Sequence, residues 1–132
     1  MPDSFFDTNV LLYLASSDTA KADRAEAVLE SGGVVSIQVL NEIANVARRK
    51  MGLPWSETHK FLSTIRSVLL VNPLTIEIHE TGLRLAEQRK LSVYDAMILA
   101  AALDAGCDTL WSEDMQNGAI IDGRLRIRNP FH

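Results

Sequence analysis

Four acidic residues stand inside apolar stretches of this 132-residue chain, where a carboxylate is unusual. They are Asp7 in SFFDTNVLLY, Glu42 in SIQVLNEIANVA, Asp95 in LSVYDAMILAAA and Asp114 in TLWSEDM. Carboxylates are rarely buried unless they are paired or hold a metal, and none of these stretches contains Lys or Arg. If folding brings them together, each like-charge pair costs roughly 4 kcal/mol at ~4 Å and an effective dielectric of ~20. A divalent cation is the natural partner of such a cluster.

Asp7 and Asp95 also have structural interpretations that the sequence leaves open. Asp7 can cap a helix beginning near Asn9, and Ser92 and Asp95 match a capping box at a helix start. However, Asp95 shares its helical face with apolar residues, which turns the carboxylate toward packed structure. A capping role and a ligand role can hold together.

The other two acids have weaker signals. Glu42 falls on the polar side of its helix. This position is expected equally for a side chain that faces solvent and for one that faces a wet polar cleft. The apolar stripe of that helix is expected at Ile37, Leu40, Ala44 and Ala47. Asp114 follows Glu113, and the sequence does not decide which of the two turns inward; loop acids are usually solvated.

The pattern of strands and helices predicts an α/β fold with three layers, α/β/α, and a mainly parallel central sheet. Strands are expected at 3–7, 34–37, 68–71, 109–111 and 124–128, and helices at 9–15, 20–31, 38–51, 56–67, 76–89 and 93–105. The run at 68–71 has the length and composition of a buried strand. Ligand sites in such sheets form at the carboxyl ends of the strands, and all four acids follow a strand or begin a helix there.

Length and composition narrow the functional classes. The chain suits a single domain over residues 1–132, and 47% hydrophobic residues allow a well-packed core. One cysteine, Cys107, excludes an intrachain disulfide and is expected in the core. No segment suits a signal peptide or a membrane span, so we expect a cytoplasmic protein without membrane contact. The net charge of −4 argues against broad affinity for nucleic acid.

Other motifs support fewer conclusions. In RLRIR, the arginines at 124, 126 and 128 alternate with apolar residues, which is typical of a charged edge strand that resists aggregation. A zinc site, a phosphate-binding loop and a nucleophile elbow are not indicated. A phosphate-accepting signalling domain needs a late Lys, yet none follows Lys90, and a haloacid-dehalogenase-type phosphatase needs an acid where Asn9 stands.

The stretches FFDTNVLLY, SIQVLNEIANV and LSVYDAMILAAALDAGCDTLWSEDM, followed by the final NPF, together resemble a PIN domain of the VapC toxin type. The resemblance covers nearly the whole chain, and the block from Leu91 to Met115 is its strongest part. Ser112 stands where many relatives have Thr, and Tyr94 where close relatives often have Trp. Some PIN domains carry a further acid a few residues after the position of Asp114, where this chain has Asn117. The number of metal ions, one or two, and any contribution of Glu113 or Asn117 to the site therefore stay open.

The resemblance implies an endoribonuclease that hydrolyses RNA with Mg²⁺ or Mn²⁺ held by the acidic cluster. Asp7 and Asp95 would ligate the metal directly. Glu42 and Asp114 would bind through water or a second ion, or would orient the nucleophile. Ser112 would add a hydrogen bond. The implied partners are RNA, a VapB-like antitoxin and a second copy of the chain. The alternative is a catalytically silent PIN scaffold that binds RNA or protein; loss of an acid would mark it, and all four are present.

Overall fold

A sheet of six short strands forms the centre of this computed structural model, which describes residues 3–132. The strands are β1 (Ser4–Phe6), β2 (Val34–Ser36), β3 (Leu70–Asn72), β4 (Thr109–Trp111), β5 (Ile120–Ile121) and β6 (Leu125–Arg128). Their order is β3-β2-β1-β4-β6-β5, and all neighbours are parallel except the antiparallel pair β5 and β6. The predicted mainly parallel sheet is confirmed.

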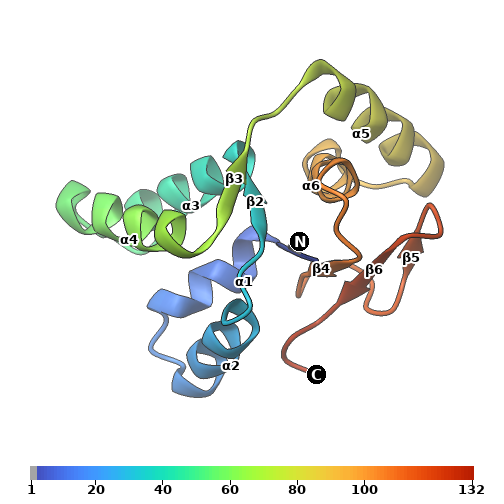
Figure 1. The fold of residues 1–132 in the computed structure, drawn as a ribbon. Coiled ribbons are helices and arrows are strands. Elements are labelled where there is room, and N and C mark those ends of the chain that lie inside the picture. The colour runs from blue at the N-terminus through green and yellow to red at the C-terminus, as the bar shows by residue number, and fades with distance from the viewer. Residues whose placement is uncertain (1–2) are drawn as a thin grey trace.

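Helices connect β1 to β2, β2 to β3 and β3 to β4, and they cover both faces of the sheet (Figure 1). They are α1 (Thr8–Leu12), the 3₁₀ turn η1 (Tyr13–Ala15), α2 (Thr19–Leu29), α3 (Ile37–Arg49), α4 (Trp55–Val68), α5 (Ile76–Arg89) and α6 (Val93–Asp104). Right-handed crossovers from β1 to β2 to β3 place α1 to α4 on one face, and the return from β3 to β4 places α5 and α6 on the other. This is the predicted three-layer arrangement.

Side-chain caps fix where several helices begin. The side-chain oxygens of Asp18, Ser36, Thr75 and Ser92 accept hydrogen bonds from backbone N–H groups in the first turns of α2, α3, α5 and α6. Two of these caps, Ser36 and Ser92, precede the helices that carry Glu42 and Asp95. The local sequence therefore sets the start of both helices and the position of each acid along them.

The core contains residues from the sheet and from the helices on both of its faces. Its most enclosed helix is α6, which is buried on all sides from Ala96 to Leu103. Phe5, Phe6 and Leu110 of the central strands are completely buried in the core. Cys107 belongs to this core, and burial raises the pKa of its thiol to about 11, as expected for an inert structural cysteine. No helix in residues 3–132 is long and apolar enough to cross a membrane.

Two predictions about strands were wrong, and one strand was missed. The strand expected at 68–71 begins two residues and ends one residue later, and it lies at the sheet edge, where Leu70 is exposed. The strand at 124–128 is not an edge strand, because β6 pairs with β4 on one side and β5 on the other. The two-residue strand β5 was not predicted. Strand order depends on the crossovers, which local patterns do not reveal.

The predicted apolar stripe of α3 is also only partly correct. The buried residues are Val39, Ile43 and Ala47, whereas Ile37 is exposed. The buried stripe is therefore rotated toward Ile43, which directly follows Glu42. This rotation carries Glu42 from the solvated side of the helix toward α1.

Candidate functional site

Asp7 is the most enclosed acid of the site. It directly follows β1, and its backbone N–H donates to the carbonyl of Trp111 in β4 at 2.9 Å. Its side chain accepts hydrogen bonds from the backbone N–H of Thr8 and from Ser112 Oγ, each at 2.7 Å. Only 5% of the residue is exposed, and it is the N-cap of α1. The predicted capping role is confirmed, with one carboxylate oxygen directed at Ser112.

The net effect of the surroundings of Asp7 is to disfavour its ionised form. Burial raises the pKa of Asp7 from 3.8 to about 6, the hydrogen bonds from Ser112 and Thr8 lower it, and the charges of Asp95 and Glu42 raise it further. A carboxylate whose pKa rises through burial and nearby carboxylates gains from a cation. The structure thus brings Asp7, Asp95 and Glu42 into one electrostatic group.

Glu42 is half-buried and held on both carboxylate oxygens. Thr8 Oγ1 donates to Oε1, and Gln38 Nε2 donates to Oε2 at 3.1 Å. Gln38 Nε2 also donates to the carbonyl of Tyr94 at 3.0 Å, immediately before Asp95. Glu42 therefore faces α1, and Gln38 connects α3 to the start of α6.

Asp95 lies half-buried in the first turn of α6, where the helix dipole favours negative charge. Its backbone N–H donates to Ser92 Oγ at 3.1 Å, which is one half of the predicted capping box. Within residues 3–132 its carboxylate accepts no hydrogen bond, so the reciprocal half is not formed. The side chain is left free to bind a ligand.

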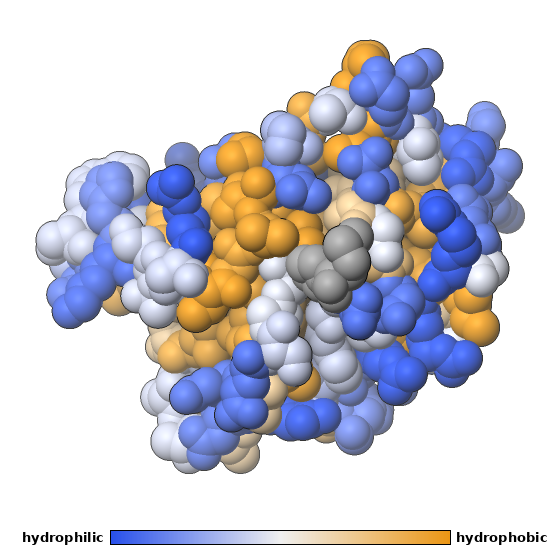
Figure 2. Space-filling view, viewed as in Figure 1, coloured by the Kyte–Doolittle hydropathy of each residue, from blue (hydrophilic) through white to orange (hydrophobic). Residues whose placement is uncertain are grey.

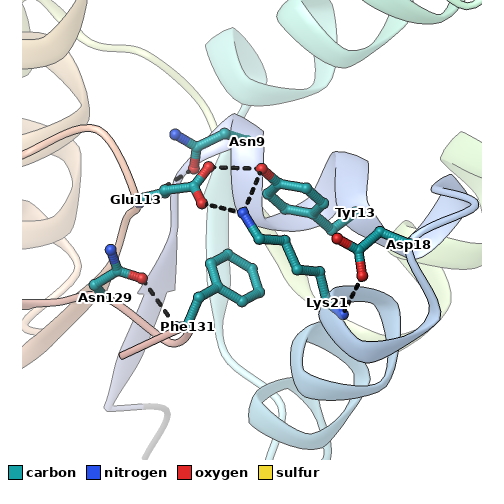
Figure 3. Close-up of polar contacts among 7 residues, drawn as sticks. All are labelled: Asn9, Tyr13, Asp18, Lys21, Glu113, Asn129 and Phe131. Atoms are coloured by element: carbon teal, nitrogen blue, oxygen red, sulfur yellow. Dashed lines mark hydrogen bonds and ion pairs between the residues drawn. The ribbon is translucent and has the colours of Figure 1, made fainter.

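Asp114 and Glu113 have different surroundings, and Figure 3 shows the Glu113 carboxylate directed toward Lys21 and Tyr13. Asp114 is exposed, and its charge is not among those that act on Asp7. Glu113 binds Lys21 Nζ at 2.6 Å and accepts from Tyr13 Oη at 2.7 Å, while Lys21 Nζ also lies 5.0 Å from the centre of the Phe131 ring. The Glu113 carboxylate is therefore held by Tyr13 of η1 and Lys21 of α2.

Asn117 and Asn129 fix the path of the C-terminal segment. The side-chain oxygen of Asn117 accepts from the backbone N–H of Asn129, and that of Asn129 accepts from the N–H of Phe131, both at 2.9 Å. Asn117 is thus occupied with a backbone contact. The roles predicted for Asp114, and the open question about Asn117, remain at the level of prediction.

Two residues that position the acids were not assigned a role from the sequence: Thr8 and Gln38. Thr8 stands next to Asp7, and its hydroxyl links α1 to Glu42. Gln38 precedes Glu42 by one helical turn, a spacing at which side chains meet. These spacings were visible in the sequence, but the contact of Gln38 with Tyr94 depends on the packing of α3 against α6.

The arrangement offers carboxylate oxygens at the carboxyl edge of the sheet, which are the donors preferred by Mg²⁺ and Mn²⁺. Among residues 3–132, no three Asp, Glu, His or Cys side chains are placed to ligate one ion together. Mg²⁺ usually binds through one or two carboxylates and retains several waters. The donor set and the raised pKa of Asp7 fit such a partly hydrated cation.

Comparison with known proteins gives a consistent result. The family model described as PIN domain matches residues 4–116. Among curated proteins, none matches the chain significantly in sequence. A chain in a toxin-antitoxin complex from Klebsiella pneumoniae has a TM-score of 0.75 and 23% identity, with 96% of this chain and 97% of that chain covered.

Two further structures share the fold. DNA-bound VapBC from Salmonella typhimurium has a chain with a TM-score of 0.73 and 20% identity, covering 98% of this chain and 99% of that one. The sarcin-ricin loop cleaving toxin VapC20 of Mycobacterium tuberculosis has a TM-score of 0.68 and 21% identity, covering 84% and 89%. At these identities the likeness establishes a common fold.

Proposed function

This chain belongs to the PIN domain family, and from that premise we propose that it is a Mg²⁺- or Mn²⁺-dependent endoribonuclease, the toxin of a VapBC-type pair. The observation that carries the proposal is the buried Asp7, whose pKa is raised by burial and by the charges of Asp95 and Glu42. The similar fold of VapC20, described as a toxin that cleaves the sarcin-ricin loop, supports RNA as substrate.

In this proposal Asp7 and Asp95 hold the metal directly. Glu42 and Asp114 contribute through water or a second ion. The cation, when bound, supplies charge stabilisation at a phosphodiester and increases the acidity of water. Ser112 holds one oxygen of Asp7, and Thr8 and Gln38 hold Glu42, so the carboxylates keep their positions before a ligand arrives.

Loss of cleavage in charge-neutral variants tests the proposal. Asp7→Asn and Asp95→Asn should each reduce cleavage of a structured RNA in Mn²⁺ by about 100-fold or more, because a charged ligand is lost while the shape is kept. Asp104→Asn, in the exposed last turn of α6, is the matched control and should cleave at the wild-type rate. Circular dichroism should be native for all three, and wild-type cleavage by either site variant refutes the ligand assignment.

The proposed partners are a VapB-like antitoxin and a second copy of the chain. Large apolar side chains are exposed at Ile37, Leu70, Leu74 and Ile76, and Figure 2 shows apolar residues gathered over β2 and β3. Exposed apolar patches mark contacts with partners. A basic side chain of the antitoxin can pair with the acidic cluster, so neutralising the basic residues of its tail should weaken inhibition.

A further inference from the structure

Three arginines occupy one exposed face at the end of the sheet. Arg126 and Arg128 of β6, with Arg124 directly before it, are exposed, whereas the intervening Leu125 and Ile127 are buried. Hydrophilic side chains gather at this end of the molecule, where β5 and β6 lie (Figures 1 and 2). Protection of a free edge does not explain the charges, because β6 pairs on both sides.

The side chains of these arginines are unpaired in the described part of the chain. Within residues 3–132, none of the three guanidinium groups forms a hydrogen bond or an ion pair; the ion pairs there are Lys21–Glu113 and Arg84–Asp122. The three line a hollow of about 290 Å³ in which Asp108 is the single carboxylate. In a chain of net charge −4, this face is a local concentration of positive charge, and it suits a polyanion.

The row of arginines leads to the acidic site. Arg128 is in register with Trp111 of β4, and its carbonyl accepts the backbone N–H of Ser112 at 2.9 Å. Ser112 Oγ in turn donates to Asp7. The carboxyl end of β6 therefore lies two hydrogen bonds from the buried carboxylate, and Arg124 lies at the far end of the same strand.

Trp111 adds an aromatic surface to this face. Paired residues of parallel strands point to the same side of a sheet, so Trp111 lies beside Arg128. Its indole is half-buried, and Nε1 donates to Ser4 Oγ at 3.3 Å, which fixes the ring. Proteins that bind single-stranded nucleic acid combine cationic grooves with aromatic rings on which bases stack.

We infer that this arginine face (Arg124, Arg126, Arg128 and Trp111) binds a single-stranded segment of the RNA substrate and directs it to Asp7. Phosphates contact the guanidinium groups, and a base stacks on Trp111 next to the site. The choice of RNA rests on the proposed function. The face itself is defined by exposure, strand register and unpaired charge.

Direct binding measurements test the inference without requiring cleavage. Fluorescence anisotropy with a labelled single-stranded RNA oligonucleotide in EDTA gives Kd across a range of salt concentrations. Arg126→Gln/Arg128→Gln should raise Kd about tenfold and reduce the salt slope by about 1.4, since each phosphate contact on a single strand contributes roughly 0.7. Arg126→Lys/Arg128→Lys should keep most of the slope, because the charge is retained.

Arg49→Gln is the matched control, an exposed arginine at the far end of α3, and should bind like the wild type. In a Trp55→Phe background, RNA should quench the fluorescence of Trp111, the remaining tryptophan. If the double Gln variant keeps its Kd within twofold and its salt slope, or if it loses only antitoxin binding, the inference is overturned.

The outcomes separate this inference from the proposed function. Salt-dependent RNA binding through the arginine face without any cleavage in Mn²⁺ would support the face and reject the nuclease. Cleavage by the wild type with unchanged KM and Kd in the double Gln variant would reject the face and support the nuclease. Melting temperatures of the variants should match the wild type, because the substituted side chains are exposed.

Discussion

The charge of Asp7 lowers the stability of the fold but suits the role proposed for this side chain. It is buried and close to two other negative charges, yet its own hydrogen bonds come from a serine hydroxyl and one backbone N–H. A neutral residue would fit the same space with less electrostatic cost. Such a destabilising group is expected where a protein binds a cation or does chemistry.

The stability of metal-free protein should therefore fall as pH rises. The folded-state pKa of about 6 lies above the ordinary value of 3.8, so between about pH 4 and pH 6 the folded protein binds more protons at Asp7 than the unfolded chain does. The free energy of unfolding then decreases as pH rises through this window. At about 1.4 kcal/mol per pKa unit, the loss is roughly 3 kcal/mol.

Asp7→Asn removes this titration. We expect its unfolding free energy, relative to wild type in EDTA, to increase by roughly 3 kcal/mol between pH 4 and pH 7.5; comparing two pH values cancels any constant cost of the altered hydrogen bonds. Urea denaturation at both pH values measures the effect. Asp104→Asn, at an exposed position, should show no such change, and parallel pH profiles for wild type and Asp7→Asn would contradict the prediction.

At the scale of residues, the sequence revealed the acids but not all of their neighbours. Asp7, Glu42 and Asp95 stood out because each interrupts an apolar stretch, and the structure gathers these three. The direction of Glu113 was not predictable, because its partners Lys21 of α2 and Tyr13 of η1 are far away in the chain.

At the scale of elements, local signals located helices better than strands. Caps at Ser36, Thr75 and Ser92 are readable in sequence, and the predicted helices follow them closely. The strands are only two to four residues long, too short for an alternating pattern to fix their ends. Whether a strand lies at an edge depends on crossovers, as the exposed β3 and the doubly paired β6 show.

Gly33 tests how closely β1 and β2 approach. A Cβ at this position would lie 2.6 Å from both the Ser4 carbonyl oxygen and the Phe6 ring, and the backbone has φ of +153°. Gly33→Ala should therefore lower the unfolding free energy by about 1 to 3 kcal/mol beyond the cost of backbone strain alone. The Phe6 side chain is completely buried and has no room to move aside, and the Ser4 carbonyl belongs to the backbone of β1.

Gly52→Ala supplies the comparison for that prediction. Gly52 also has a positive φ, +66°, but a Cβ there has no neighbour within 4 Å. Its substitution should cost only the conformational term of about 1 to 2 kcal/mol. Urea denaturation of both variants gives the difference, and an equal loss at the two positions would show that the contact between β1 and β2 is not tight.

At the scale of the whole molecule, the candidate site exists only when the sheet is assembled. Asp7 follows β1, Glu42 lies on α3 and Asp95 on α6, and these elements are far apart in the chain. A cation that binds this group binds the folded state and not the unfolded chain. Its binding free energy is then added to the stability of the entire domain.

Mg²⁺ or Mn²⁺ should accordingly raise the melting temperature of the wild type above its value in EDTA. A metal concentration of about 100 times Kd adds about 2.7 kcal/mol, which corresponds to roughly 5 to 10 °C for a domain of this size.

Asp7→Asn and Asp95→Asn should lose most of the increase, because they remove the proposed direct ligands. Asp114→Asn should lose less, since Asp114 is exposed and is proposed to contribute through water or a second ion, and Asp104→Asn should respond like the wild type. Differential scanning fluorimetry across a metal titration measures all five proteins; an unchanged wild-type melting temperature, or an equal increase in Asp7→Asn, would mean that no cation binds at the carboxyl edge of the sheet.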